Sequence, residues 1–588
     1  MKNIKYLLAV LGGMLIVSCS KKELQIGDAD PANNKFKTTS FTNAFPSAIP
    51  NDPFTPYLTS TPTILQTIST QNSGSGATAI TTKRFTFKSK GGVNTVYAIM
   101  TYPQAAGTYP AILFNHGGGG NAETMWRDPM QTFANLGYVT MAIDIPGIAG
   151  TDQCPNSSGP WKSAAAGEGP RLNVTGGPQN STLFDGGVAE IEAFNFLAAQ
   201  ANVNNTKMGV SGVSWGGYMT TMLSGILGSR VKAAYAIYGC GFYDLGTYWS
   251  SLLEAMTPAD RTTWETYLDA GRRCPYMTAP YFIEEPSDDT YFWPEGVAGT
   301  LNAIPGTKNH VVMPDSNHHE FPPGRSMKQM YMDYYLKGTG NAFGSVTIAS
   351  TVVQTDGSLQ VNMTTSLAPS TSVSAVQLFY SVPTANWQTR SWLPITATLV
   401  SGTTYRATIP ASQVNQNVNY FGQFTDSRTV VTSTLIYQTG YMDHFDALTG
   451  WGSSNTLTLN TTDKKEGTGS IQSVGSSTDE FKRLFTTPYN SGATVVSGSI
   501  QFWYYISDVT KMGTSNQIEI GSGGAPDVQE YSWNLGTLVN GWNLISKPFS
   551  SAATTGGTPN LNAINWFRVY DVKTGSITTK IDGLQVLK

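Results

Sequence analysis

Charged residues are scarce in this sequence: Lys, Arg, Asp and Glu make up 13% of its 588 residues, about half the share in a typical globular chain. The two signs nearly cancel, because 36 basic against 39 acidic residues give a formal net charge of −3. Such a composition supplies no positive field for phosphates and argues against a nucleic-acid partner. The hydrophobic content of 40% and the aromatic content of 11% exclude a disordered chain. At roughly 150 residues per domain, the length predicts three or four domains.

Long apolar runs are also scarce. The apolar stretch over residues 6–17, which follows two lysines, is shorter than the roughly twenty residues that a membrane-spanning helix needs. A basic start and a short apolar core are typical of a signal peptide, which we expect over residues 1–18. Its end, Leu-Ile-Val-Ser-Cys at residues 15–19, resembles the bacterial lipobox, which implies cleavage before Cys19 and lipidation of that cysteine. An ordinary secretory signal with a free or paired Cys19 is the alternative.

A lipid anchor on Cys19 implies an outer-membrane lipoprotein of the bacterial cell envelope, periplasmic or surface-exposed. The other cysteines are Cys154, Cys240 and Cys274, an odd number for an oxidising compartment. We expect one disulfide and one buried thiol. Cys240 with Cys274 is the favoured pair because both flank one insertion between strands, and Cys154 with Cys274 is the alternative. The cysteines lack the spacing of metal ligands, and we predict no metal and no cofactor.

Strands and helices alternate in the first large part of the chain. We expect a polar tether over residues 19–58 and a domain over residues 59–341. The expected strands are 84–87, 95–100, 111–114, 138–144, 208–211, 231–238, 281–283 and 310–313, and the expected helices are 188–199, 218–227 and 325–336. This alternation predicts a parallel, doubly wound sheet. Reactive groups then lie at the carboxyl ends of its strands.

Helical patterns stop beyond Gly344. Short alternating strands over residues 342–440 predict a β-sandwich of immunoglobulin type. Residues 441–588 are strand-rich and contain many Trp, and they resemble jelly-roll carbohydrate-binding modules. The motifs that carry this resemblance are at 466–471, 502–505, 541–543 and 564–569. Exposed aromatic rings there would stack on sugars, and a purely adhesive or spacing domain is the alternative. Asp443, Asp446 and Asp582 are the candidates for a structural calcium ion, although their spacing alone does not predict one.

The sequence Gly-Val-Ser-Trp-Gly at residues 212–216 is a G-x-S-x-G motif centred on Ser214. About half a match is expected by chance in this Gly- and Ser-rich chain, so the context decides. The motif follows the strand 208–211 and precedes the helix 218–227, as in the nucleophile elbow of α/β hydrolases. The alternative is a glycine-rich turn with a capping serine.

A serine nucleophile needs a base, and histidine has the appropriate pKa. Of the five histidines, His444 lies in the β-rich tail, His310 begins a buried strand, and His116 comes too early in the chain. That leaves the pair after the last core strand. We favour His318 over His319, because the preceding Pro-Asp-Ser-Asn resembles the loop that carries the base in α/β hydrolases.

The acid is expected after the strand 281–283. Asp289 precedes an aromatic-Pro segment, which resembles the position of the acid in such enzymes. Asp288 is the alternative, and Glu284 and Glu285 are then polar residues at the end of the strand. The order Ser214, Asp289, His318 is that of α/β hydrolases.

An oxyanion hole needs fixed backbone donors. Four glycines follow His116, directly after an early buried strand. We expect one amide from Trp215 and the other from Gly118 or a neighbouring glycine. A merely flexible turn is the alternative.

Residues 60–340 together resemble the α/β-hydrolase superfamily. The elbow with Gly-Tyr-Met at 217–219 is similar to prolyl-oligopeptidase-type peptidases and to acetyl-xylan-esterase and dienelactone-hydrolase-like enzymes. Such peptidases carry a large β-propeller before the catalytic domain, which the short N-terminal segment here cannot form, so an esterase is favoured. Dienelactone hydrolases proper use cysteine where this chain has Ser214.

The resemblance implies a surface-anchored serine carboxylesterase that removes acetyl or similar acyl groups from polysaccharide. A serine peptidase or a polyester hydrolase of the same fold is the alternative, and a non-catalytic carbohydrate-binding surface protein is the alternative of another class. The expected partners are an ester-bearing polysaccharide or other polymer and, through the anchor, the membrane. Aromatic residues in the insertions 154–184 and 241–277 either select the substrate or pack a lid.

Overall fold

The computed structural model describes residues 49–588 except 165–166, 355–357, 383–386, 415–417, 439–440, 466–468, 490, 492, 497 and 588. The predicted signal peptide, the lipidation site Cys19 and most of the predicted tether lie outside these residues. Within the described part of the chain, no helix has the length and apolar character needed to cross a membrane.

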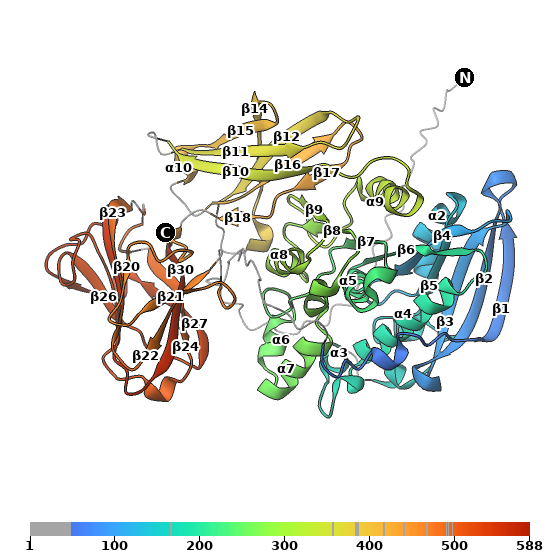
Figure 1. Cartoon of the computed structure of the whole chain (residues 1–588), viewed down its shortest axis with the longest axis horizontal. Coiled ribbons are helices and arrows are strands. Elements are labelled where there is room, and N and C mark those ends of the chain that lie inside the picture. The colour runs from blue at the N-terminus through green and yellow to red at the C-terminus, as the bar shows by residue number, and fades with distance from the viewer. Residues whose placement is uncertain are drawn as a thin grey trace, which may run out of the picture. The chain divides into compact units, whose positions relative to one another are not determined.

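The first domain is built on a nine-stranded sheet with the order β1-β2-β3-β5-β4-β6-β7-β8-β9 (Figure 1). Its strands are β1 (Ile64–Ser73), β2 (Ile80–Ser89), β3 (Asn94–Pro103), β4 (Tyr109–Asn115), β5 (Val139–Ile143), β6 (Val203–Val213), β7 (Ala233–Ile237), β8 (Tyr281–Pro286) and β9 (Lys308–Met313). The first three strands pair antiparallel, and β4 to β9 pair parallel. Each strand expected from the sequence occurs. β1 was not expected, because it is a largely exposed, polar edge strand.

Helices cover both faces of this sheet. The helices are α1 (Ala122–Met125), α2 (Gln131–Asn135), α3 (Gly169–Leu172), α4 (Thr182–Ala198), α5 (Trp215–Leu227), α6 (Ser250–Glu254), α7 (Pro258–Tyr267), α8 (Pro294–Ala303) and α9 (Gly324–Met332). On β8, the Tyr281 hydroxyl lies 2.8 Å from the Thr221 hydroxyl of α5. The next residue, Phe282, packs its ring 5.9 Å from Tyr331 of α9. Because successive strand residues point to opposite faces, α5 and α9 lie on opposite sides, and the doubly wound prediction is confirmed.

The domain begins earlier than the expected boundary at residue 59. Phe54 is fully buried, with its ring centroid 4.8 Å from that of Phe184. Asp52 forms an ion pair with the buried Arg273. Residues 52–58 therefore pack on the domain, and the predicted tether is shorter at this end.

The predicted disulfide is wrong. Cys154, Cys240 and Cys274 are all buried free thiols. The Cys274 thiol lies 3.5 Å from the carbonyl oxygen of Ala270 in its own helical turn, whereas Cys240 packs against Gly296 of α8. Flanking the same insertion thus does not lead to a bond between the two thiols. Burial raises the thiol pKa of each, which keeps these groups protonated and unreactive.

The second region, within residues 345–438, is an antiparallel β-sandwich. One sheet has the order β10-β11-β15-β14 and the other β13-β12-β16-β17, with β18 paired to β16. The elements are β10 (Ser345–Val353), β11 (Leu359–Ser366), β12 (Val373–Ser381), β13 (Leu393–Thr396), β14 (Thr398–Ser401), β15 (Thr404–Ile409), α10 (Ala411–Val414), β16 (Asn419–Asp426), β17 (Val431–Ser433) and β18 (Tyr437–Gln438). Val361, Leu378 and Phe424 belong to one buried cluster between the sheets.

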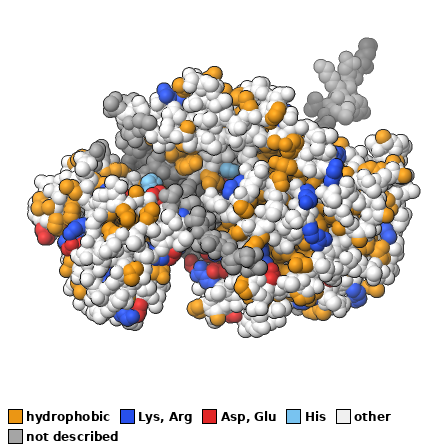
Figure 2. All heavy atoms as spheres, viewed as in Figure 1, with side chains coloured by type: hydrophobic (Ala, Val, Ile, Leu, Met, Phe, Trp, Pro, Cys, Tyr) orange, Lys and Arg blue, Asp and Glu red, His pale blue; other side chains and the backbone are white. Residues whose placement is uncertain are grey.

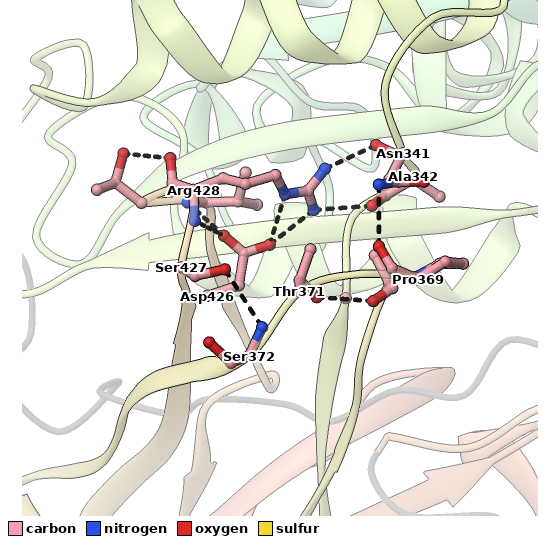
Figure 3. Close-up of polar contacts among 12 residues, drawn as sticks. Asn341, Ala342, Pro369, Thr371, Ser372, Asp426, Ser427 and Arg428 are labelled. Carbon is pink, nitrogen blue, oxygen red and sulfur yellow. Dashed lines mark hydrogen bonds and ion pairs between the residues drawn. The ribbon is translucent and has the colours of Figure 1, made fainter.

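Arg428 fastens this sandwich to the chain that leaves the first domain. It lies in the turn between β16 and β17, and its guanidinium donates to the backbone carbonyls of Asn341 and Ala342, each at 2.9 Å (Figure 3). Asp426 accepts a further bond from the same guanidinium at 2.6 Å. The pair fixes the turn against residues 341–342.

The third region, from residue 441, is a second antiparallel β-sandwich. Its sheets have the orders β21-β22-β30-β24-β27, with β19 beside β30, and β20-β23-β29-β25-β26-β28. The strands are β19 (Tyr441–Asp443), β20 (Trp451–Gly452), β21 (Leu457–Asn460), β22 (Ser470–Gly475), β23 (Asp479–Tyr489), β24 (Ser499–Ile506), β25 (Gln517–Gly521), β26 (Glu530–Asn534), β27 (Gly541–Pro548), β28 (Ala553–Thr555), β29 (Ile564–Asp571) and β30 (Ile577–Leu587). The expectation of two β-sandwiches after the α/β domain is confirmed.

The three carboxylates considered for calcium have other partners. Asp443 forms an ion pair with Arg483. Asp446 accepts from the Gly469 amide at 2.7 Å, and Asp582 accepts from the Lys465 amide. No group of three His, Cys, Asp or Glu side chains suited to a metal occurs among the residues that the structure describes.

Candidate active site

Ser214 occupies a strained turn between β6 and α5. Its backbone has φ 57° and ψ −123°, a region that non-glycine residues avoid and that marks functional sites. A side chain at Gly216 would overlap the carbonyl of Asn115, and one at Gly212 would overlap Gly216. The two glycines are therefore required for this turn, which has the strand-turn-helix geometry of a nucleophile elbow. The first domain has the α/β-hydrolase fold.

The α/β-hydrolase domain brings the three predicted triad residues together. The Nε2 atom of His318 lies 3.1 Å from Oγ of Ser214. Its Nδ1 atom lies 3.0 Å from both carboxylate oxygens of Asp289. His318 follows β9 and Asp289 follows β8, so all three side chains project from carboxyl ends of parallel strands, where such sheets carry their sites.

The Asp289 carboxylate is fixed by its own loop. It is fully buried, and its Oδ1 accepts from the backbone amides of Tyr291 at 2.7 Å and Phe292 at 3.1 Å. These bonds hold the carboxylate toward His318. The imidazole side chain is 27% exposed, which leaves it accessible to a substrate.

The alternative carboxylates have other partners. Asp288 pairs with Arg390 at 3.3 Å, and burial raises its pKa to about 6. Glu284 accepts bonds from the Tyr235 hydroxyl and the Phe321 amide, each at 2.8 Å. Burial raises the pKa of Glu284 to about 7.

The other histidines lie elsewhere. The Ile145 amide donates to Nε2 of His116 at 3.0 Å, and Nδ1 of His116 lies 2.8 Å from the carbonyl of Gly117. Burial lowers the pKa of His116 and of His310 to about 4, so both are neutral groups in the core. His319 is exposed beside His318.

The glycine loop lies against the nucleophile. A side chain at Gly117 would lie 3.3 Å from Cβ of Ser214, and one at Gly118 would lie 3.0 Å from the indole of Trp215. The amides of Gly119 and Gly120 are used within the loop region, at 2.9 Å to Ile148 and 3.0 Å to Gly117. Among the described backbone hydrogen bonds of turns and loops, none uses the amides of Gly118 or Trp215, so both are available as oxyanion donors.

Aromatic residues surround the triad more closely than the sequence indicates. The Tyr238 ring lies 4.4 Å and the Tyr291 ring 4.8 Å from the imidazole of His318. Sequence reasoning missed both residues. Tyr238 directly follows β7, and Tyr291 follows Asp289 near the start of the acid loop. Residues at these strand ends face the site, and this is the signal that would have found both.

The aromatic insertions form a packed cluster next to Trp215. The Trp249 ring lies 4.6 Å from that of Trp215, and Tyr243 stacks on Trp249 at 5.1 Å. Tyr243, Trp249 and Trp264 are buried, whereas Tyr248 is 45% exposed. Most of these rings therefore pack the insertion, and Tyr248 keeps an exposed surface.

No protein-family model matches the sequence, and no curated protein matches it. Solved structures that are similar include acetyl xylan esterase 1 from Thermoanaerobacterium sp. JW/SL YS485, with 18% identity, a TM-score of 0.41, and coverage of 50% of this chain and 95% of that chain. An acetyl xylan esterase from Paenibacillus sp. R4 has 16% identity, a TM-score of 0.38, and coverage of 46% and 88%. A cold-adapted esterase from an Arctic intertidal metagenomic library has 18% identity, a TM-score of 0.32, and coverage of 46% and 100%. These likenesses concern the fold alone.

Proposed function

We propose that this chain is a serine carboxylesterase. The observation that carries the proposal is the unbroken chain of contacts from Ser214 through His318 to Asp289. Such a chain activates a hydroxyl that is otherwise a weak nucleophile. No cofactor is needed for this chemistry.

The reaction proceeds in two steps. Ser214 Oγ attacks the ester carbonyl while its proton passes to Nε2 of His318, and Asp289 stabilises the imidazolium that forms. The amides of Gly118 and Trp215 hold the negative oxygen of the tetrahedral intermediate. His318 then gives the proton to the leaving alcohol, and the acyl group remains on Ser214. Water, deprotonated by His318, releases the acid and restores the serine.

The aromatic packing beside Ser214 favours a small acyl group such as acetyl. Trp215, the residue after the nucleophile, is 4% exposed and lies in contact with Trp249 and Tyr243. Phe292 packs 5.2 Å from Trp249. Close packing beside the nucleophile supports a small acyl group over a long acyl chain.

A neutral polysaccharide is the proposed carrier of the ester. Figure 2 shows charged side chains on the visible face only in small separate groups among uncharged atoms, as suits an uncharged polymer. In the second sandwich, Tyr505 and Trp542 are half-buried neighbours across β24 and β27, with rings 5.5 Å apart. They support glycan binding by this region. We also propose, from the lipobox-like sequence before Cys19, that the chain is anchored through Cys19 at the cell envelope.

Labelling with a fluorophosphonate probe tests the proposal. We expect stoichiometric labelling of the chain lacking residues 1–19 and none of Ser214→Ala. Absence of labelling in the unmutated chain, or equal labelling of the variant, contradicts a serine hydrolase.

A substrate comparison separates the alternatives. Faster release from acetylated xylan than from an aminoacyl amide or a polyester supports the esterase, and the reverse order supports the peptidase or polyester hydrolase. Turnover of p-nitrophenyl acetate that is lost in His318→Ala excludes a purely adhesive surface protein.

A further inference from the structure

One segment of the first sandwich reaches the two loops that carry Asp289 and His318. This segment, Trp387–Trp392, lies between β12 and β13. Its Gln388 side chain donates to the backbone carbonyl of Asp289 at 3.4 Å. Its Trp392 amide donates to the Asp315 carboxylate, on the loop before His318, at 2.8 Å. A region outside the α/β-hydrolase domain therefore contacts the acid loop and the base loop together.

Arg390 is the charged centre of this segment. Its side chain is 2% exposed and forms an ion pair at 3.3 Å with Asp288, whose side chain is 6% exposed. The same guanidinium donates to the carbonyl of Ser287 at 2.8 Å. It lies over the rings of Trp387 and Trp392, at 5.2 Å and 4.8 Å from their centroids. Planar stacking and a two-point contact suit arginine and not lysine.

Arg390 affects the geometry of the triad through Asp288. Asp288 precedes Asp289, and its amide donates to the carbonyl of Ser316 at 2.9 Å. The acid loop and the base loop are thus joined by the bond from Asp288 to Ser316, which lies two residues before His318. A shift of Asp288 changes the separation of Asp289 from His318, on which the proton transfer depends.

The first sandwich is held against β9, the edge strand of the nine-stranded sheet. The Val312 amide of β9 donates to the Ser433 hydroxyl at 3.0 Å, and the Gln423 side chain donates to the Val312 carbonyl at 3.0 Å. One buried cluster spans the boundary and comprises Val312, Phe379, Trp392, Phe421 and Ile436. Since β9 leads into the loop of His318, its edge is fixed by the second region.

We propose that Arg390 is a positioning residue for the proposed esterase. Through this residue, the first sandwich contributes to the geometry of the active site. The guanidinium holds the Ser287–Asp289 backbone so that the carboxylate of Asp289 faces His318. This inference rests on the proposed function. We therefore expect loss of Arg390 to lower the rate of the chemical step and not to weaken substrate binding.

The chain offers a matched control in Arg428. This arginine also joins the sandwich to the first domain, by bonds to Asn341 and Ala342 (Figure 3), but its described contacts include neither triad loop. Arg390→Gln and Arg428→Gln each remove one guanidinium group that joins the first sandwich to the first domain. Both are expected to lower the melting temperature, whereas only Arg390→Gln is expected to impair catalysis.

The experiment measures kcat and KM for p-nitrophenyl acetate and the rate of fluorophosphonate labelling in folded protein. We expect Arg390→Gln to lower kcat and the labelling rate by roughly 10- to 100-fold, with KM within about 3-fold of the unmutated value. Arg428→Gln is expected to keep kcat within about 2-fold. Arg390→Lys, which retains charge without the planar fork, is expected to fall between Arg390→Gln and the unmutated chain.

Four outcomes are decisive. A folded Arg390→Gln with unchanged kcat overturns the inference, and so does an equal loss of kcat in Arg428→Gln. If Arg390→Gln does not fold, unchanged kcat in folded Arg390→Lys overturns it instead. If the unmutated chain itself neither hydrolyses the ester nor takes the label at Ser214, the proposed function fails, and this result is distinct from the others.

Discussion

The ring of Tyr238 lies 4.4 Å from the imidazole of His318, centroid to centroid, at a tilt of 51°. Tyr238 directly follows β7 in a left-handed backbone conformation with φ 46°, and it is 6% exposed. This backbone conformation directs the ring of Tyr238 toward His318. Together with Tyr291, it limits the rotation of the imidazole about its contacts to Ser214 and Asp289.

Removing the ring of Tyr238 should loosen the base. We expect Tyr238→Ala to lower kcat for p-nitrophenyl acetate by about 10-fold or more, since the imidazole gains rotational freedom. Tyr238→Phe keeps the ring and is the control, with kcat expected within about 2-fold. A loss in Tyr238→Phe as large as in Tyr238→Ala would show that the hydroxyl, and not the ring, matters.

The two adjacent aspartates should differ sharply. Asp289→Asn removes the charge that orients His318 and stabilises its protonated form, so we expect kcat to fall by about 10³- to 10⁴-fold. Asp288→Asn acts only through the backbone, and a loss of about 10-fold is expected. Steady-state kinetics of the two folded variants checks this order, and a larger loss in Asp288→Asn would exchange the roles of the two residues.

Gly216 should tolerate no side chain. A methyl group there overlaps the Asn115 carbonyl, in a part of the domain without free space, so Gly216→Ala is expected to cost about 3 kcal/mol of stability or to prevent folding. Gly306→Ala is the control, because a methyl group at Gly306 meets nothing within 4 Å. Thermal unfolding of both variants tests the difference, and equal melting temperatures would contradict the crowding seen at the elbow.

The sequence was sufficient to predict the parallel strands and to single out three side chains that the structure brings together, for physical reasons. Buried strands such as β4 are continuous apolar runs, and the G-x-S-x-G turn has strict steric needs at Gly212 and Gly216. Chain order placed the acid after the strand 281–283 and the base after the last core strand. Resemblance to the loops of α/β hydrolases then favoured Asp289 over Asp288 and His318 over His319. The structure places both where that order requires, within hydrogen-bonding distance of each other.

Other features depend on distances that a sequence pattern does not contain. Cys240 and Cys274 flank one insertion, but their thiols are not bonded. The contact of Arg390 with Asp288 joins residues 102 positions apart, and no local periodicity indicates it. The edge strand β1 has mostly exposed residues, so it lacks the apolar alternation by which strands are recognised.

Glu284 should make stability depend on pH. Its carboxyl is fully buried, and burial raises its pKa to about 7, whereas an unfolded glutamate has a pKa of about 4.3. The folded state therefore binds this proton more tightly than the unfolded state does. The stability from this group is fully present below about pH 4 and is lost as the pH rises to about 7.

The variant Glu284→Gln cannot titrate and should lack this loss. Between pH 5 and pH 8, the free energy of unfolding of the variant is expected to gain about 2 to 3 kcal/mol relative to the unmutated chain. Urea unfolding at several pH values in that range provides the measurement. Glu254→Gln, at an exposed position, is the control and should follow the unmutated chain at every pH. If the free energies of unfolding of Glu284→Gln and the unmutated chain change in parallel with pH, Glu284 is already ionised at pH 5. The bonds that it accepts from Tyr235 and Phe321 would then outweigh the effect of burial on its pKa.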